Sequence, residues 1–199
     1  MEGPHPTRNL ADAGFFEKLA RPIALFNTCR GEVIDEPALR AARTSGKIRH
    51  LVLDVFAGEP RPDPATCAAA DLVTPHIAGY SLPGKLNGTT QIAAAFRRHF
   101  GFTDKWEPVY PAPAAAELAY AGEADTAFIR KCIAAVYDVA EDDARLRAAL
   151  SGDEPGKGFD RLRREYPIRH EFVSFVVTRL PGEKRELRSR LQALGFRLG

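Results

Sequence analysis

The sequence has no apolar run near the roughly 18 residues that a membrane-spanning helix needs, and no apolar segment follows Met1–Pro6 as it would in a secretory signal. Its three cysteines, Cys29, Cys67 and Cys132, are scattered and include no Cys-x-x-Cys pair. This odd set favours a reducing cytoplasm over a disulfide framework. A net charge of +2 gives no strong attraction for nucleic acid or a membrane surface. We therefore expect a cytoplasmic globular protein without a metal site, a nucleic-acid partner or a membrane anchor.

The N-terminal half of the sequence instead alternates apolar runs with helical patterns. Strands are predicted where an apolar run ends in polar residues, at 21–27, 49–56 and 72–73. Short helices are predicted between and before them, at 12–20, 37–45 and 65–70. The first strand is expected to be buried on both faces, and the continuous apolar character of the second suits a parallel sheet. The pattern predicts an α/β fold.

A side chain capable of chemistry follows each predicted strand. Arg30 follows the first, Asp54 and Glu59 follow the second, and His76 follows the third. Parallel strands bring their carboxyl ends to one edge of a sheet, where open α/β folds bind ligands. An arginine fork suits a carboxylate, and a glutamate can hold an imidazole in one tautomer for proton transfer. Together these groups suit the oxidation of an alcohol next to a carboxylate.

Several of these residues also have a purely structural interpretation. His76 can be a loop histidine bonded to a nearby carbonyl. Asp54 can be a strand-end carboxylate satisfied by neighbouring amides, and Cys29 a small packing residue. Against this, Pro75 gives His76 a rigid exit from the strand, and Gly79 lets the backbone approach a flat ligand closely.

A Pro-rich segment at 105–113 reads as an extended linker after a helix predicted from about Gly84 to Phe100. The basic end of this helix, 97–99, suits a solvated last turn, with a phosphate site as the alternative. Beyond the linker the sequence predicts helices at 125–137, 141–150, 158–166 and 183–194, and strands at 171–177 and 196–198. The charges of 141–150 suit an exposed face. We expect one domain over 1–104 and a smaller one over 114–199.

Three motifs resemble a known family. They are Asn-Thr-Cys-Arg-Gly at 27–31, Leu-Asp-Val-Phe-Ala-Gly-Glu-Pro at 53–60 and Thr-Pro-His-Ile-Ala-Gly-Tyr-Ser at 74–81. They resemble signatures of the D-isomer-specific 2-hydroxyacid dehydrogenases, in a branch that acts on a phosphorylated 2-hydroxy acid. The resemblance covers nearly the whole chain but only the C-terminal part of the family's enzyme.

The resemblance implies the second half of a Rossmann-type NAD-binding domain over 1–104 and a homodimerising α/β domain over 114–199. It implies that Arg30, Glu59 and His76 are catalytic, with Arg30 on the substrate carboxylate and His76 taking the hydroxyl proton. It further implies two sets of binding residues. Those that bind NAD are Thr28, Cys29, Arg30, Asp54 and Gly79, and those that contact substrate are Arg30 and Tyr80.

The sequence departs from the family because it contains no Gly-x-Gly-x-x-Gly on a strand-to-helix turn, the element that holds a dinucleotide diphosphate. The family's substrate domain is also missing from the match. Three functions therefore remain open. The chain is part of an NAD-dependent dehydrogenase, or a catalytically silent remnant that keeps a dimerisation module, or one polypeptide of a split enzyme.

Overall fold

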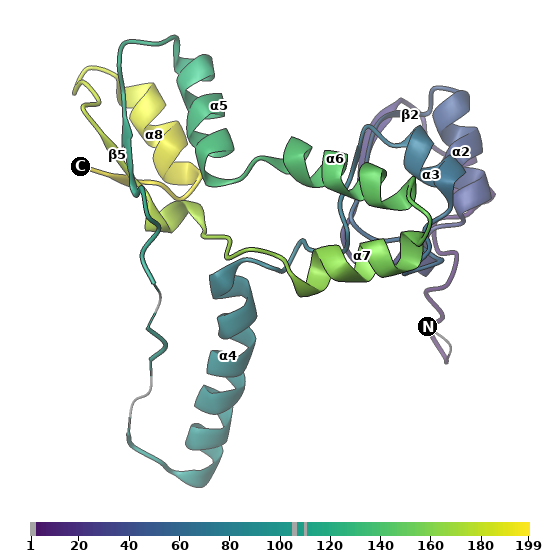
Figure 1. The fold of residues 1–199 in the computed structure, drawn as a ribbon, viewed down its shortest axis with the longest axis horizontal. Helices are drawn as coiled ribbons and strands as arrows, with labels where there is room; N and C mark the ends of the chain where they lie inside the picture. Colours follow the sequence, from purple (N-terminus) through teal and green to yellow (C-terminus); the bar gives the residue numbers. More distant parts are fainter. Residues whose placement is uncertain (1–2, 105–106, 110) are drawn as a thin grey trace. The chain divides into compact units, whose positions relative to one another are not determined.

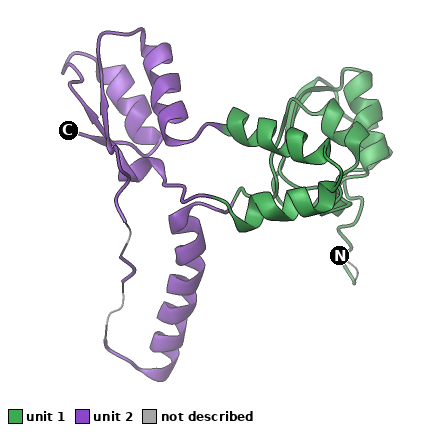
Figure 2. Cartoon of the chain, in the orientation of Figure 1, with its two compact units in different colours: residues 1–78, 139–166 green, residues 79–138, 167–199 purple. Residues whose placement is uncertain are grey.

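The computed structural model describes residues 3–104, 107–109 and 111–199. They form two compact units, one built from the chain up to residue 78 together with 139–166, the other from 79–138 and 167–199 (Figure 2). Both units contain a parallel three-stranded sheet with helices, which confirms the predicted α/β class. In the predicted linker, Lys105, Trp106 and Tyr110 lie outside the described residues.

The sheet of the first unit has the order β1-β2-β3, formed by β1 (Ile23–Asn27), β2 (Ile48–Leu53) and β3 (Leu72–Val73) (Figure 1). The chain crosses between these strands through the short 3-10 helix η1 (Gly31–Val33), α2 (Glu36–Thr44) and α3 (Pro64–Ala69), and α1 (Ala13–Glu17) precedes β1. Aspartates cap the three α-helices, as Asp35 does by accepting from the Ala38 amide at 3.3 Å. The elements agree with prediction to within a few residues.

Two features of this sheet differ from expectation. β1 is not buried on both faces, because Phe26 is 67% exposed and Ala24 is exposed as well. β2 ends at Leu53 rather than Phe56. The physical reason is that the Phe56 amide donates to a side chain, the Glu59 carboxylate, at 3.0 Å instead of to a neighbouring strand.

The helices α6 (Val139–Leu150) and α7 (Pro155–Arg164) belong to the first unit, where Leu146 and Phe159 join the core around Leu51. The expected division, with 114–199 as one domain, therefore does not coincide with the compact units. Hydrogen bonds fix α6 in place: the carboxylate of Asp143 accepts from the Val73 amide at 2.7 Å.

The sheet of the second unit has the order β4-β5-β6, formed by β4 (Glu117–Ala119), β5 (Val176–Thr178) and β6 (Arg197–Leu198). Its other elements are α4 (Leu82–Phe100), α5 (Asp125–Val136), the 3-10 helix η2 (Phe172–Ser174) and α8 (Arg185–Ala193). Phe128, Val177 and Leu191 are fully buried in its core. β4 was not predicted, and the expected strand at 171–177 is η2 followed by β5.

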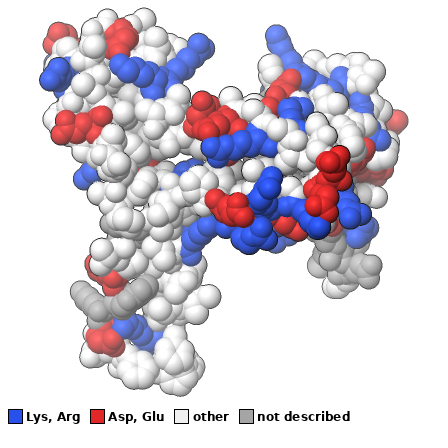
Figure 3. Space-filling model, viewed as in Figure 1, with Lys and Arg blue, Asp and Glu red and all other residues white. Residues whose placement is uncertain are grey.

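Among the described residues, no helix combines the length and apolar character needed to cross a bilayer. On the face drawn in Figure 3, acidic and basic side chains are interspersed rather than gathered by sign.

Candidate active site

The first unit places its candidate catalytic and binding residues at one edge of the sheet. Arg30, Asp54 and His76 follow the carboxyl ends of β1, β2 and β3, which run parallel in one sheet. This is the edge at which open parallel sheets bind ligands. The sequence prediction that these strand ends are neighbours is confirmed.

The core of this site is an imidazole–carboxylate pair. His76 Nδ1 lies 2.8 Å from Glu59 Oε2, and the two side chains are 27% and 22% exposed. The other glutamate oxygen, Oε1, accepts from the Phe56 amide at 3.0 Å. Because both glutamate oxygens are engaged, the carboxylate is fixed and holds Nδ1 of His76, which leaves Nε2 as the ring nitrogen available to a substrate.

His76 has a backbone conformation that is uncommon outside glycine, with φ of 55°. Its amide donates to the carbonyl of Asp54 at 2.7 Å. The Asp54 side chain is 2% exposed and accepts from the Thr74 hydroxyl at 2.6 Å, the Ile77 amide at 2.8 Å and the Ala78 amide at 3.0 Å. A strained backbone at a candidate site persists only where its surroundings impose it, and here Asp54 does so.

These bonds match the structural interpretation of Asp54 as a carboxylate satisfied by neighbouring amides. They make Asp54 a residue that positions His76, and its predicted contact with a cofactor stays a prediction.

Sequence reasoning missed Asn27, which organises the loop that carries Arg30. Asn27 is 4% exposed. Its Oδ1 accepts from the Cys29 amide at 3.2 Å and from Cys29 Sγ at 2.9 Å, while its Nδ2 donates to the Arg30 carbonyl at 3.0 Å. The signal in the sequence is a polar amide that ends an apolar strand and precedes an arginine.

Gly31 joins this loop to the one that holds Glu59. A Cβ at Gly31 would lie 1.9 Å from the Phe56 carbonyl carbon and 2.2 Å from the Ala57 nitrogen. Only glycine permits this backbone approach. The Ala57 amide in turn donates to Glu36 Oε1 at 2.9 Å. The carboxylates of Glu59 and Glu36 therefore both hold the backbone of Phe56 and Ala57, against which Gly31 packs.

The remaining predicted residues are exposed, except Tyr80, which is half-buried. Thr28, Cys29 and Arg30 are exposed, and the Arg30 guanidinium donates to the Cys29 carbonyl at 2.6 Å. Gly79 and Tyr80 belong to the second unit, where the ammonium of Lys85 lies 4.3 Å from the centre of the Tyr80 ring.

The three thiols differ in environment. Burial raises the pKa of Cys67 to about 12 and that of Cys132 to about 11, whereas Cys29 is exposed at the site. No group of three or more metal-ligating side chains occurs in the part of the chain that the structure describes.

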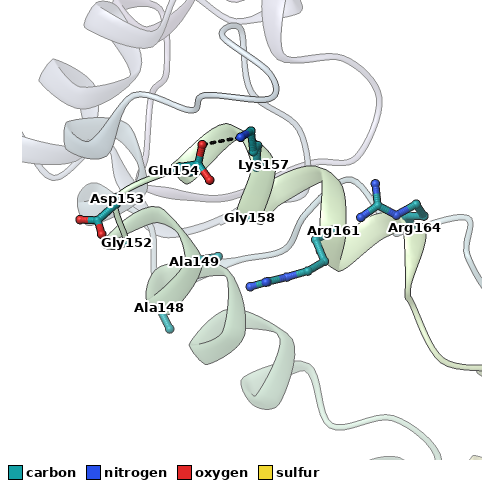
Figure 4. A pocket seen from close by; sticks show the side chains of 9 residues that line it. All are labelled: Ala148, Ala149, Gly152, Asp153, Glu154, Lys157, Gly158, Arg161 and Arg164. Atoms are coloured by element: carbon teal, nitrogen blue, oxygen red, sulfur yellow. Dashed lines mark ion pairs between the residues drawn. The ribbon is translucent and has the colours of Figure 1, made fainter.

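A cavity of about 440 Å³ between α6 and α7 contains none of the predicted site residues (Figure 4). Its charged lining has both signs, including the ion pair between Lys157 and Glu154 at 2.5 Å. These side chains are exposed, which is typical of a hydrated surface groove.

Comparison with known proteins gives matches to two family models. Residues 3–78 match the NAD-binding domain of the D-isomer specific 2-hydroxyacid dehydrogenases, and residues 109–195 match a domain of unknown function, DUF3410. Residues 3–78 are therefore similar to a segment of the NAD-binding domain of that dehydrogenase class.

The similar individual proteins include members of one branch of this class. The chain is 42% identical to the erythronate-4-phosphate dehydrogenase of Azotobacter vinelandii and 38% identical to that of Marinobacter nauticus, in both cases over 98% of its length. It corresponds to their C-terminal part and spans 52% of each. The expected resemblance, including its restriction to the C-terminal part, is confirmed.

A solved D-isomer specific 2-hydroxyacid dehydrogenase from Xanthobacter autotrophicus, crystallised with NADPH and MES, is 38% identical over 51% of this chain and 43% of that chain, with a TM-score of 0.40.

Proposed function

We propose that this chain supplies the proton-transfer and nicotinamide-binding part of an NAD-dependent dehydrogenase that oxidises a 2-hydroxy acid. From the resemblance we further propose oxidation of 4-phospho-D-erythronate to 2-oxo-3-hydroxy-4-phosphobutanoate, a step of vitamin B6 biosynthesis, in the cytoplasm. The observation that carries the proposal is the His76–Glu59 pair, whose 2.8 Å contact lies at the edge of a parallel sheet. The pair's geometry fits a proton acceptor, and its setting fits a ligand site.

In this reaction His76 takes the hydroxyl proton at Nε2, because Glu59 occupies Nδ1 and stabilises the imidazolium that forms. Arg30 binds the substrate carboxylate through its guanidinium fork, which requires the side chain to exchange its contact with the Cys29 carbonyl for one with substrate. Tyr80 contributes a hydroxyl to the substrate. NAD, when bound, would supply the hydride acceptor.

The residues present fit one end of NAD. The exposed backbone of Thr28 and Cys29 and the strand-end loop that Asp54 organises would hold the nicotinamide end, together with Gly79. The sequence provides no Gly-x-Gly-x-x-Gly for the diphosphate. We therefore expect the isolated chain to bind NAD with a Kd above about 1 mM, and micromolar binding in calorimetry would contradict this.

Combining this chain with the N-terminal half of a relative tests the catalytic assignment. Residues 1–199 are fused behind, or mixed with, the N-terminal half of the Azotobacter vinelandii relative, and NADH formation is followed with a 2-hydroxy acid. His76→Ala should lower kcat by about 10²–10⁴. Arg30→Lys keeps the charge but loses the fork, so both substrate affinity and turnover should fall. Glu59→Gln should change the pH–rate profile.

His50→Ala is the matched control, because His50 is an exposed histidine of β2 outside the site. A His76→Ala protein that runs at the parent's rate would refute the assignment. Alkylation of Cys29 gives a second readout that needs no turnover. High concentrations of NAD should slow this alkylation in the restored enzyme, since Cys29 is exposed within the proposed nicotinamide site.

A second candidate is that this chain is one polypeptide of a split dehydrogenase or a silent remnant that only self-associates. For either case we propose homodimerisation through residues from about 114 onward. Light scattering of the full chain after size exclusion tests this, and a monomer at tens of micromolar would contradict it.

A further inference from the structure

Helix α7 packs against the loop that carries Glu59. The amide of Phe56 donates to the Glu59 carboxylate at 3.0 Å, so the position of Phe56 decides where this carboxylate lies. The Phe56 ring is 2% exposed and meets the fully buried ring of Phe159, on α7, edge to face, with centroids 6.4 Å apart and an interplanar angle of 83°. Both rings belong to the core of the first unit.

The first turn of α7 contacts the same loop a second time, after Glu59. A Cβ on Gly156 would lie 3.1 Å from Cγ of Arg61 and 3.6 Å from Cγ of Pro60. The backbone of the helix therefore lies directly against the two residues that follow Glu59. Contacts before and after the carboxylate limit the movement of the loop in both directions along the chain.

Helix α7 is itself fixed by α6, beside which it lies (Figure 1). The two helices pack closely, since a Cβ on Gly158 would lie 3.0 Å from that of Ala149 (Figure 4). On α6, the Asp143 carboxylate accepts from the Val73 amide at 2.7 Å, three residues before His76. The α6–α7 pair thus contacts both segments that supply the imidazole–carboxylate pair.

We propose that Phe159 is a positioning residue for this pair, which holds the Phe56 ring and thereby keeps Glu59 where it engages Nδ1 of His76. The inference rests on the proposed function, because it takes His76 and Glu59 as the groups that transfer the proton. A ring that only filled the core would contribute stability without setting the state of the imidazole. Since α7 lies within the match to the domain of unknown function, that segment gains a role besides the proposed dimerisation.

The tautomer of His76 tests this role without turnover. Long-range proton–nitrogen NMR spectra of the full chain show which ring nitrogen of a neutral imidazole carries the proton, and the signal lost in His76→Ala identifies His76. The parent should show the Nδ1–H tautomer, because a carboxylate only accepts. Phe159→Leu keeps an apolar side chain but removes the ring edge. It should lower the ratio of the Nδ1–H to the Nε2–H tautomer by at least about threefold, since the hydrogen bond to Glu59 is weakened.

Phe16→Leu is the matched control. Phe16 is 2% exposed in the same core but lies on α1, which packs on α2, so this variant should leave the tautomer ratio of His76 unchanged. Urea unfolding confirms that each variant is folded. If Phe159→Leu is not, Phe159→Met takes its place, because an unbranched side chain refills the space more readily.

A parent-like ratio in a folded Phe159 variant would overturn the proposal. An equal fall of the ratio in Phe16→Leu would also overturn it, because the effect would then come from a loosened core rather than from α7. An Nε2–H tautomer in the parent would refute the His76–Glu59 pair itself, and the proposed function with it. Loss of catalysis in the restored enzyme changes none of these spectra, so failure of the proposed function is distinguishable from failure of this positioning role.

Discussion

Asp54→Asn changes the residue that holds the His76 loop in its conformation. The carboxylate accepts from the Thr74 hydroxyl and from the amides of Ile77 and Ala78. An asparagine can keep one oxygen acceptor, but it presents an NH₂ donor where the other oxygen receives the Ala78 N–H. The substitution therefore removes one hydrogen bond and weakens two others by removing the negative charge.

The expected magnitude follows from the burial of this group, which is 2% exposed. Hydrogen bonds to charged groups contribute about 1.5–3 kcal/mol each. Losing one and weakening two should lower the free energy of unfolding of the first unit by about 2–4 kcal/mol. With a urea dependence of about 2 kcal/mol per M, the midpoint should fall by about 1–2 M.

Two buried cysteines allow the units to be followed separately. Cys67 lies in the core of the first unit and Cys132 in that of the second. Because burial raises the pKa of Cys67 to about 12 and of Cys132 to about 11, both thiols alkylate slowly until their unit unfolds. Pulses of alkylating reagent across a urea series, read by peptide mass spectrometry, give a midpoint for each unit.

Asp54→Asn should shift the Cys67 midpoint and leave the Cys132 midpoint in place. Asp153→Asn is the matched control, since Asp153 is an exposed aspartate of the first unit, and it should shift neither. An Asp54→Asn protein whose Cys67 midpoint equals the parent's would refute the assignment of Asp54 as the residue that fixes this loop.

Two further predictions concern the same unit. Gly31→Ala forces a Cβ to within 1.9 Å of the Phe56 carbonyl carbon, so it should cost about 3 kcal/mol in the Cys67 assay; an unchanged midpoint would contradict the packing. The Leu51 amide, and then Arg43, hold the pKa of Asp71 below its ordinary value of 3.8. The stability that Asp71 supplies is thus complete above that value and lost as pH falls through the folded pKa. Asp71→Asn should reduce the loss of unfolding free energy at acidic pH, as measured by urea titrations. A loss as steep as the parent's would contradict this.

The sequence predicted the parts of the site that follow from local pattern. An apolar run followed by polar residues marks a strand end, and this placed Arg30, Asp54 and His76 at one edge of the sheet. The helix predicted at 37–45 was equally predictable, because its cap at Asp35 and the left-handed Gly46 that follows it act within a few residues.

Contacts between loops had no such local signature. Gly31 must be glycine because of the Phe56 and Ala57 backbone, which lies in another loop. The hydrogen bonds of Asp54 go to residues about twenty positions later in the chain, and these bonds support the unusual φ of His76. Each of these depends on how two loops meet, which periodicity and composition do not encode.

The placement of α6 shows the same limit and changes how dimerisation must be tested. Its charges suited an exposed face of a separate C-terminal domain, but Asp143 accepts from the Val73 amide, and Arg147 donates to the carbonyls of Cys67 and Ala70 at 3.1 Å each. These bonds join residues 70 to 80 positions apart and compensate the burial of strand and helix ends in the first unit. A segment that starts at residue 114 would retain Asp143 and Arg147 but lose their partners, exposing the apolar side of α6. Self-association of such a segment could then be caused by this newly exposed apolar surface alone. The oligomeric state therefore has to be measured on the full chain.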